Sequence, residues 1–324
     1  MKIETVDDLR KLRYGIIGAG ALGGFYGSLL CKNGYRTAFL MRSTAKDVKE
    51  HGLKINSAWG KWEVHPEVFD SPQDMGVCDI LIVGLKTISN VSLKEIFKHT
   101  VGPQTIVITL QNGFGNEEYI ESMLPDNSAT PGISRVIGGC SFICCWRENS
   151  TVINHTAGGN IEFAELDGVE RPRIKAICQM LNDMKIPCAI KSSPADVRWH
   201  KLVWNIPFSG LGLVAKADTA AVLNSPELRA TARRIMAEIQ MIAKQDGIDI
   251  TDKFCEWQFE RTESMGHYKS SMQIDYECKR EAEVEAILGE PVRRARKLGV
   301  AVPLMEMIYG AAKLLNCLNI QDAK

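Results

Sequence analysis

One lysine lies within a strongly apolar segment in the second half of the chain. In the stretch VRWHKLVWNIPFSGLG, which begins at Val197, Lys201 is flanked by tryptophan, leucine, valine, isoleucine and phenylalanine side chains. Burying an ammonium group costs several kcal/mol unless the charge is paired. Lys201 therefore either extends along its own apolar stem to reach water or has a chemical task, and the spacing alone favours neither interpretation.

The same segment predicts a polar stripe along a helix. At about 100° per residue, Lys201, Asn205, Ser209 and Gly212 share one narrow face. Another, apolar face is formed by Trp199, Leu202, Val203 and Ile206. Pro207 can bend such a helix, which affects the placement of Ser209 more than that of Asn205.

A second group of polar residues occurs in HYKSSMQIDYECKREAEVEAIL. Ser270 and Ser271 precede a helical pattern, and Ser270-x-x-Gln273 fits a capping box. The start of a helix with free hydroxyl and amide groups is also a suitable site for a carboxylate. Glu283 is expected further along the same helix, where a solvated glutamate is the ordinary interpretation because the segment is rich in charge.

A glycine-rich turn near the start of the chain predicts a dinucleotide site. The segment GAGALG supplies Gly-x-Gly-x-x-Gly at Gly18, Gly20 and Gly23, between a predicted strand and a predicted helix. The first glycine makes the tight turn, the second lets a pyrophosphate approach the main chain, and the third lets helix and strand pack closely. The alternative is a purely structural turn. The expected cofactor-binding residues here are Gly18, Ala19, Gly20, Ala21, Leu22 and Gly23.

Polar residues follow three further predicted strands. An NAD site usually has an acidic residue after the second strand, but this chain has Arg42, which could bind a 2′-phosphate through two hydrogen bonds. We therefore expect NADP, against the alternative of a solvated arginine. Lys86 and Asn112 follow the next two strands, where ligands bind in open α/β sheets.

The order of patterns predicts an α/β fold with two domains. Short apolar runs such as DILIVGLK and TIVITLQN alternate with helical segments, which indicates a Rossmann-type, doubly wound parallel sheet with helices on both faces. The segment LKINSAWGKWEVHPEVF suggests an inserted hairpin, and residues 132–166 suggest antiparallel strands. Beyond residue 195 nearly everything is helical, with stops near Gly247, at 289–291 and near Gly299. We place a nucleotide-binding domain at 1–192 and an all-α substrate domain at 193–324.

Composition excludes several classes of protein. Lys and Arg total 39 and Asp and Glu total 39, so there is no net charge to attract nucleic acid or an anionic membrane. The ten cysteines have no C-x-x-C spacing, which favours reduced thiols in a cytoplasmic protein. The N-terminus lacks an apolar signal core, and no run approaches the roughly 20 apolar residues of a spanning helix. The six histidines show no metal-binding pair, so no metal is expected.

Together these motifs resemble those of the ketopantoate reductases (2-dehydropantoate 2-reductases). The similarity extends from Tyr14 to about Leu314. It rests on GIIGAGALGGFYG, VGLKT, LQNGFGNEE, WHKLVWN, SSMQID and REAEVEAILGEPVRRARKLGVAVP. The glycine motif is shared by many enzymes, whereas the later motifs in this order are far more specific. The first dozen residues extend beyond the usual start of the family and are treated as an arm.

The resemblance implies roles for the predicted residues. Lys201 corresponds to the general acid and Glu283 to the second catalytic residue. The substrate-binding positions match Asn112, Asn205, Ser209 and Ser271, and the cofactor-binding positions match the glycine-rich turn with Arg42, Lys86 and Asn112. Ser209 departs from the family, many members of which have a second asparagine at that position.

The implied reaction is hydride transfer from NADPH to the C2 ketone of ketopantoate. A lysine, whose ordinary pKa is about 10.4, is charged at neutral pH and can protonate the new alkoxide. Two alternatives remain at this point: the same chemistry on another branched 2-oxo acid, or a non-catalytic NADP-binding sensor. The partners implied are a small-molecule substrate and a second copy in a homodimer, without nucleic acid or membrane.

Overall fold

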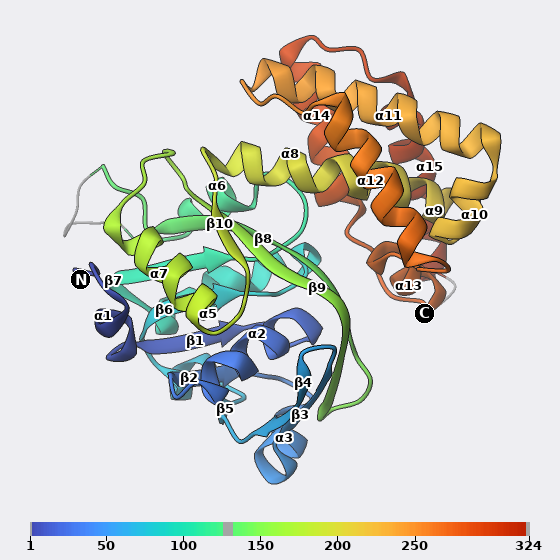
Figure 1. The fold of residues 1–324 in the computed structure, drawn as a ribbon. Coiled ribbons are helices and arrows are strands. Elements are labelled where there is room, and N and C mark those ends of the chain that lie inside the picture. Colours follow the sequence, from blue (N-terminus) through green and yellow to red (C-terminus); the bar gives the residue numbers. More distant parts are fainter. Residues whose placement is uncertain (1, 126–131, 322–324) are drawn as a thin grey trace. The chain divides into compact units, whose positions relative to one another are not determined.

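The chain forms two compact units. The computed structural model describes residues 2–125 and 132–321. The first unit contains Met1–Gln111 and Asn116–Val197, and the second contains Arg198–Lys324 together with the short segment Asn112–Gly115. In Figure 1 the first unit runs from blue to yellow-green and the second is mainly yellow to red. The predicted boundary at residues 192–193 falls a few residues before the change at Val197.

A ten-stranded sheet forms the centre of the first unit. Its strand order is β4-β3-β9-β8-β7-β6-β1-β2-β5, with β10 paired to β9. The run from β8 to β5 is parallel, whereas β8–β9 and β3–β4 are antiparallel, as the sequence predicted for both segments. The strands are β1 (Arg13–Ile17), β2 (Arg36–Leu40), β3 (Leu53–Ser57), β4 (Gly60–Val64), β5 (Glu67–Phe69), β6 (Cys78–Val83), β7 (Val101–Thr109), β8 (Val136–Arg147), β9 (Val152–Glu165) and β10 (Cys188–Ile190).

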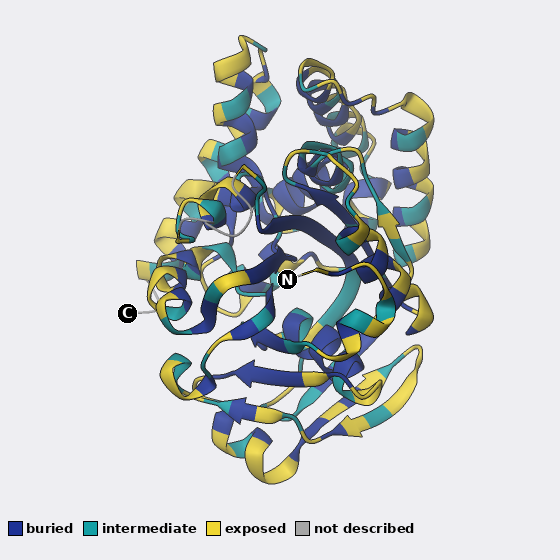
Figure 2. Cartoon of the chain, turned by 90° about the vertical axis from the view of Figure 1, so that its left-hand side faces the viewer, coloured by how far each residue is buried: buried dark blue, intermediate teal, exposed yellow. Residues whose placement is uncertain are grey.

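Helices cover both faces of this sheet, which confirms the doubly wound prediction. Successive residues of a strand point to opposite faces, and Ile16 and Ile17 of β1 belong to two separate hydrophobic cores. Figure 2 shows the buried strands beneath helices with exposed outer sides. The helices are α1 (Val6–Arg10), α2 (Ala21–Lys32), α3 (Ala45–His51), α4 (Pro72–Met75), the 3₁₀ segment η1 (Thr87–Ser92), α5 (Leu93–Thr100), α6 (Asn116–Glu121) and α7 (Pro172–Asp183).

The N-terminal arm is part of this core. Thr5 caps α1 in a capping box with Asp8. Leu9 is fully buried, and the Tyr14 hydroxyl donates a hydrogen bond to the Leu9 carbonyl oxygen over 3.1 Å. α1 packs on α7. The extension therefore covers the first core with an apolar side chain.

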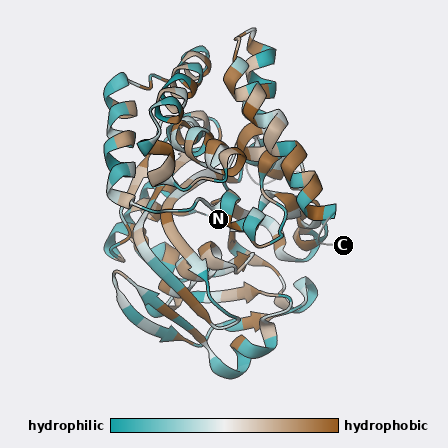
Figure 3. Ribbon diagram, turned by 90° about the vertical axis from the view of Figure 1, so that its right-hand side faces the viewer, coloured by the Kyte–Doolittle hydropathy of each residue, from teal (hydrophilic) through white to brown (hydrophobic). Residues whose placement is uncertain are grey.

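The second unit is all-α, as predicted, apart from two π-helical segments. Its elements are the C-terminal part of α8 (Pro194–Trp204), η2 (Asn205–Gly210), α9 (Leu211–Ala215), α10 (Thr219–Asn224), α11 (Pro226–Gln245), α12 (Asp252–Met265), α13 (Ser271–Glu277), η3 (Glu285–Gly289), α14 (Glu290–Leu298) and α15 (Pro303–Gln321). In Figure 3 apolar and polar residues alternate along these helices. No helix within the described ranges is long and apolar enough to cross a membrane.

One predicted helix stop is wrong. Gly299 ends α14 with φ of +70°, and Gly247 follows α11 with φ of +76°, as expected. At residues 289–291, however, η3 continues directly into α14. Pro291 lies in the first turn of α14, and the wider π turn before it lets the chain pass a residue that cannot donate an i→i−4 hydrogen bond.

Candidate active site

The glycine-rich turn has the geometry of a dinucleotide-binding loop. Gly18 follows β1 with φ of +87°, and a Cβ there would lie 2.5 Å from the Leu85 nitrogen. A Cβ on Gly23 would lie 2.4 Å from the Gly18 carbonyl oxygen. At both positions a side chain would collide with neighbouring main-chain atoms, so glycine is required whether or not a ligand is bound. A Cβ on Gly20 would meet no heavy atom of the described residues within 4 Å, so internal packing does not require this glycine, and the prediction that a phosphate approaches the main chain here fits that open space.

The start of α2 is suited to an anion. Gly20 is its N-cap, with no side-chain cap, and the first turn has no acidic residue. Ala21, Leu22 and Gly23 form that turn, so their main-chain amides and the helix dipole present partial positive charge. These features fit the pyrophosphate of a dinucleotide.

The other predicted residues of the first unit lie beyond the neighbouring strands. The order β2-β1-β6-β7 is parallel throughout, so these four strands end at one edge of the sheet. Arg42 follows β2, is exposed, and forms no ion pair with the described residues. Lys86 follows β6 and is half-buried at the start of η1. Beyond β7, the Gln111 side chain donates to Leu85 O over 2.9 Å, which joins two of these strand ends.

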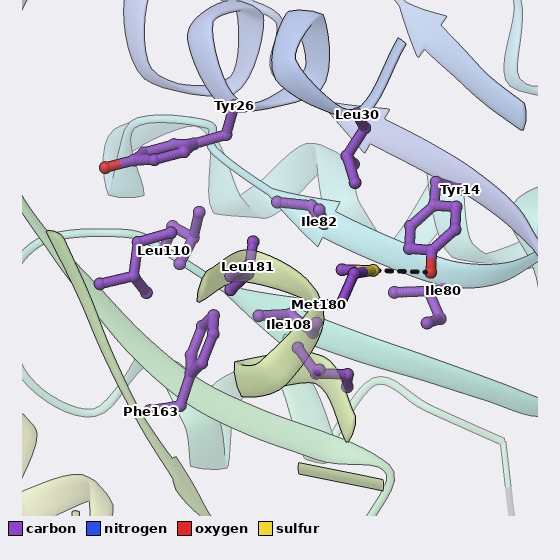
Figure 4. Close-up of a pocket in the computed structure, with 12 residues that line it drawn as sticks. Tyr14, Tyr26, Leu30, Ile80, Ile82, Ile108, Leu110, Phe163, Met180 and Leu181 are labelled. Carbon is purple, nitrogen blue, oxygen red and sulfur yellow. Dashed lines mark hydrogen bonds between the residues drawn. The ribbon is translucent and has the colours of Figure 1, made fainter. Parts of the chain in front are cut away.

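An apolar pocket lies away from these residues. It is a small apolar cavity inside the first unit, between the sheet and helices α2 and α7 (Figure 4). There the Tyr14 hydroxyl donates to Met180 Sδ over 3.4 Å, and burial raises the pKa of Tyr14, so the hydroxyl keeps its proton. None of its lining residues belongs to the predicted site. Its lining residues all belong to the hydrophobic core of the first unit.

In the second unit, the predicted polar residues of α8 and η2 lie in a buried environment. On α8, Trp199, Leu202 and Val203 are fully buried and Lys201 is half-buried. Asn205 is 5% exposed and Ser209 3% exposed. Asparagine and serine are mostly surface residues, and they are buried where their polar groups have partners or a task.

The predicted straight stripe changes at Asn205. A regular helix would place Ser209 directly in line with Lys201 and Asn205, but residues 205–210 are π-helical. A π-helix has i→i+5 hydrogen bonds, so each turn takes up about one more residue and Ser209 is rotated from that line. Pro207 lacks the amide hydrogen that an α-helix would use, which is the local reason for the change.

The two serines before α13 have separate roles. Ser270 is buried and is the N-cap, since its hydroxyl accepts a hydrogen bond from the Gln273 amide over 3.4 Å. Ser271 is the first residue of the helix and is exposed. The cap predicted for this pair thus belongs to Ser270, which leaves the Ser271 hydroxyl available.

Glu283 does not lie on the helix of Ser271, contrary to the prediction. α13 ends at Glu277, and Lys279 adopts φ of +55°, a left-handed conformation that breaks the helix. The Asn316 side chain accepts a hydrogen bond from the Ala282 amide over 2.9 Å and fixes the next segment. Glu283 then precedes η3 and is 6% exposed. A glutamate this buried is not the solvated residue that the charge-rich sequence suggested.

Packing brings these elements together in the second unit. η2 contacts both α13 and η3. η2, which contains Asn205 and Ser209, is therefore a neighbour of α13, which begins at Ser271, and of η3, which follows Glu283. Lys201, on α8, lies one helical turn before Asn205, which is the first residue of η2.

The segment that contains Asn112 is anchored in the same unit. The Phe114 amide donates to Ala286 O of η3 over 3.0 Å. Gly113 has φ of +90°, and a Cβ there would lie 2.5 Å from the same oxygen. The segment is therefore held at η3 by its main chain, and only glycine permits the close approach.

The Phe114 ring is also held from two sides. The Trp199 ring lies 4.9 Å away between centroids, and the Arg294 guanidinium carbon lies 4.9 Å from the Phe114 centroid. Asp246 fixes both neighbours: it accepts from Trp199 Nε1 over 2.7 Å and from Arg294 through two hydrogen bonds of 2.6 Å. We call Phe114, Trp199, Asp246 and Arg294 the Phe114 clamp. It places Asn112 near η3 and α8.

Comparisons with known proteins match this architecture along nearly the whole chain. The family models "Ketopantoate reductase PanE/ApbA" and "Ketopantoate reductase PanE/ApbA C terminal" match residues 14–168 and 195–316. The chain belongs to the ketopantoate reductase family. This confirms the resemblance seen in the sequence, and the family is one of pyridine-nucleotide-dependent oxidoreductases.

Individual members of the family are similar over their full length. A 2-dehydropantoate 2-reductase from Nostoc sp. is 33% identical over 96% of this chain and 97% of its own. The crystal structure of the Geobacter metallireducens 2-dehydropantoate 2-reductase has a TM-score of 0.88 at 33% identity, covering 97% of this chain and 100% of that one. The enzyme from Methylococcus capsulatus has a TM-score of 0.85 at 30% identity, covering 95% and 98%.

The predicted binding of the substrate carboxylate by Ser271 can be tested by mutation. If Ser271 binds the substrate carboxylate, Ser271→Ala should raise KM for the 2-oxo acid, leave the Kd of NADPH unchanged and leave Tm unchanged. Ser270→Ala is the matched control: it removes the cap and should lower stability by about 0.5–2 kcal/mol with little change in KM. Thermal unfolding measures the stability of both variants, and steady-state kinetics measure their KM for the 2-oxo acid. A KM increase for Ser270→Ala alone would contradict the assignment.

The Phe114 clamp was missed from the sequence and gives a further prediction. We expect Phe114→Ala to lower kcat/KM at least about tenfold, because a displacement of about 1 Å at a positioned group can cost a hundredfold. If Phe114 acts by placing Asn112, the double variant Asn112→Ala/Phe114→Ala should be no worse than Asn112→Ala alone. Phe114→Tyr, which keeps a ring in the clamp, should retain most activity. Additive losses in the double variant would mean that Phe114 acts independently of Asn112.

Proposed function

We propose that the protein reduces 2-dehydropantoate to pantoate with NADPH, the reductive step of pantothenate biosynthesis. The observation that carries this proposal is the set of buried polar residues Asn205, Ser209 and Glu283 on or beside the contacting elements η2 and η3, with Lys201 one helical turn before Asn205. Membership of the ketopantoate reductase family supports the choice of reaction. We place the reaction in the cytoplasm, where the ten cysteines, all free thiols, would stay reduced.

Lys201 is the proton donor in this proposal. NADPH, when bound, supplies the hydride for the C2 carbonyl carbon. The Lys201 ammonium stabilises the negative charge that develops on the C2 oxygen and transfers a proton to it. Trp199, Leu202 and Val203 on the same helix are fully buried, and apolar surroundings of this kind strengthen the field of a half-buried ammonium.

The remaining residues hold the substrate. Ser271 and the first amides of α13 bind the carboxylate, while Asn205 and Ser209 bind polar groups of the substrate. Glu283 orients the substrate hydroxyl or pairs with Lys201. Asn112, placed by the Phe114 clamp, contacts both cofactor and substrate. Exposed Met307, Leu314 and Leu318 on α15 support the homodimer that the resemblance implies.

The first alternative is the same reaction on another branched 2-oxo acid. Ser209 stands where many members of the family have asparagine, and a hydroxyl cannot make the paired contacts of an amide. A second alternative, an NADP-binding sensor without activity, would not need the buried set around Asn205 and Glu283.

A single assay separates these proposals. NADPH oxidation, followed by absorbance, is measured with 2-dehydropantoate and with a series of other branched 2-oxo acids. We expect the highest kcat/KM with 2-dehydropantoate. A higher value with another 2-oxo acid supports the first alternative, and NADPH binding without turnover of any of them supports the sensor.

A further inference from the structure

Arg147, at the end of β8, contacts the glycine-rich turn. One Nη donates a hydrogen bond to the Ala19 carbonyl oxygen, between Gly18 and Gly20. The other nitrogens donate to the main chain of the β8–β9 turn, over 3.1 Å to Asn149 O and also to Ser150 O. β8 and β9 both pack against α2, as Figure 1 shows. One guanidinium therefore joins the hairpin turn to the loop at the start of α2.

The charge of this arginine has no carboxylate partner among the described residues. All three of its hydrogen-bond acceptors are neutral carbonyl oxygens. The neighbouring carboxylate of Glu148 accepts a hydrogen bond from Asn154 instead, over 2.7 Å. Arg147 is half-buried, and burial lowers its pKa without any opposing effect from a nearby anion. A partly desolvated charge without a counter-ion is costly, so binding of an anion near this guanidinium would be favourable.

The place of Arg147 identifies the anion. Its guanidinium lies at the turn that leads into α2, whose N-terminus has neither an acidic residue nor a side-chain cap. Two sources of positive potential, the helix dipole and the guanidinium, thus coincide at one turn. The group that binds at such a turn in a pyridine-nucleotide enzyme is the pyrophosphate.

We propose that Arg147 is a cofactor-binding residue whose positive charge offsets that of the dinucleotide pyrophosphate and whose hydrogen bond to Ala19 positions the glycine-rich turn. The proposal rests on the dinucleotide binding proposed above and adds a residue distant in sequence from the glycine motif. It separates two arginines by function. Arg42 is expected to act on the 2′-phosphate, which only NADPH has, whereas Arg147 acts on the pyrophosphate, which NADH and NADPH share.

The test compares Kd values for NADPH and NADH, measured by fluorescence titration. Arg147→Gln can still donate to carbonyl oxygens but has no charge, and it should weaken both cofactors by a similar factor of about 10–100. Arg147→Lys keeps the charge and should recover most of the affinity. The affinity of the unmutated protein should also fall more steeply with salt than that of Arg147→Gln, because part of it is electrostatic.

The outcomes separate this inference from the proposed function. If the unmutated protein binds neither NADPH nor NADH, the proposed function fails. If the unmutated protein binds both cofactors and Arg147→Gln binds each of them with the same Kd as the unmutated protein, only the role of Arg147 is overturned. A lower Tm with unchanged Kd for both cofactors, or equal losses in Arg147→Gln and Arg147→Lys, would also overturn it, because Arg147 would then be a structural link alone.

Discussion

Replacing Lys201 by alanine is expected to lower kcat at least about a hundredfold, with the Kd of NADPH nearly unchanged. The reason is that general-acid help contributes roughly 10²–10⁴-fold to such reactions, and Lys201 lies in a helix whose neighbouring residues are buried. If the lysine only extended to solvent, its removal would leave turnover intact. The measurement is kcat at saturating substrate, with a hydride isotope effect to show that chemistry limits the rate.

Two further lysines make this test specific. Lys253→Ala, at an exposed position on α12, is the matched surface control and should leave kcat unchanged. Lys86 is expected to position ligand, so Lys86→Ala should act more on KM than on kcat. The kcat–pH profile of the unmutated protein should fall on the alkaline side as the Lys201 ammonium loses its proton, and Lys201→Ala should lack that limb. Near-normal turnover in Lys201→Ala would exclude the proposed mechanism.

Arg42→Ala is expected to weaken NADPH binding by about 10–100-fold and NADH binding hardly at all. A charge-assisted contact to the 2′-phosphate is worth roughly 1.5–3 kcal/mol, and Arg42 is exposed after β2 without an ion pair to the described residues. Titration of both cofactors into both proteins measures the difference.

The same strand supplies the control for Arg42. Arg36 is also exposed, at the opposite end of β2, and Arg36→Ala should change neither Kd. If the unmutated protein bound NADH and NADPH equally, the preference for NADPH would be wrong from the start. A loss of both cofactors in Arg42→Ala would instead indicate damage to the whole site.

The parts of this protein that the sequence predicted are those with a local physical cause. The spacing of Gly18, Gly20 and Gly23 is set by one turn and the first residues of one helix, so it can be read without knowing what packs around them. Strands buried on both faces appear as continuous apolar runs. The cap before α13 was predicted for the same reason, because Ser270 and Gln273 are only three residues apart.

The errors occurred where a distant segment or an unusual helix intervened. Glu283 was assigned to the helix of Ser271 because the pattern stays helical. The break depends on the left-handed Lys279 and on Asn316, which lies 34 residues from Ala282. Ser209 was placed by the period of a regular α-helix, which the π segment alters.

The tertiary structure alone identified Phe114 and Arg147 as candidate site residues. Phe114 was visible only as an aromatic residue between two glycines, and its role depends on Trp199, Asp246 and Arg294 from separate helices. Arg147 lies 128 residues from Ala19, and their contact follows from the packing of β8 beside α2. Periodicity and spacing record what a residue does within its own helix, strand or turn. Which segments meet is decided by strand order and helix packing, which depend on the burial of the whole chain.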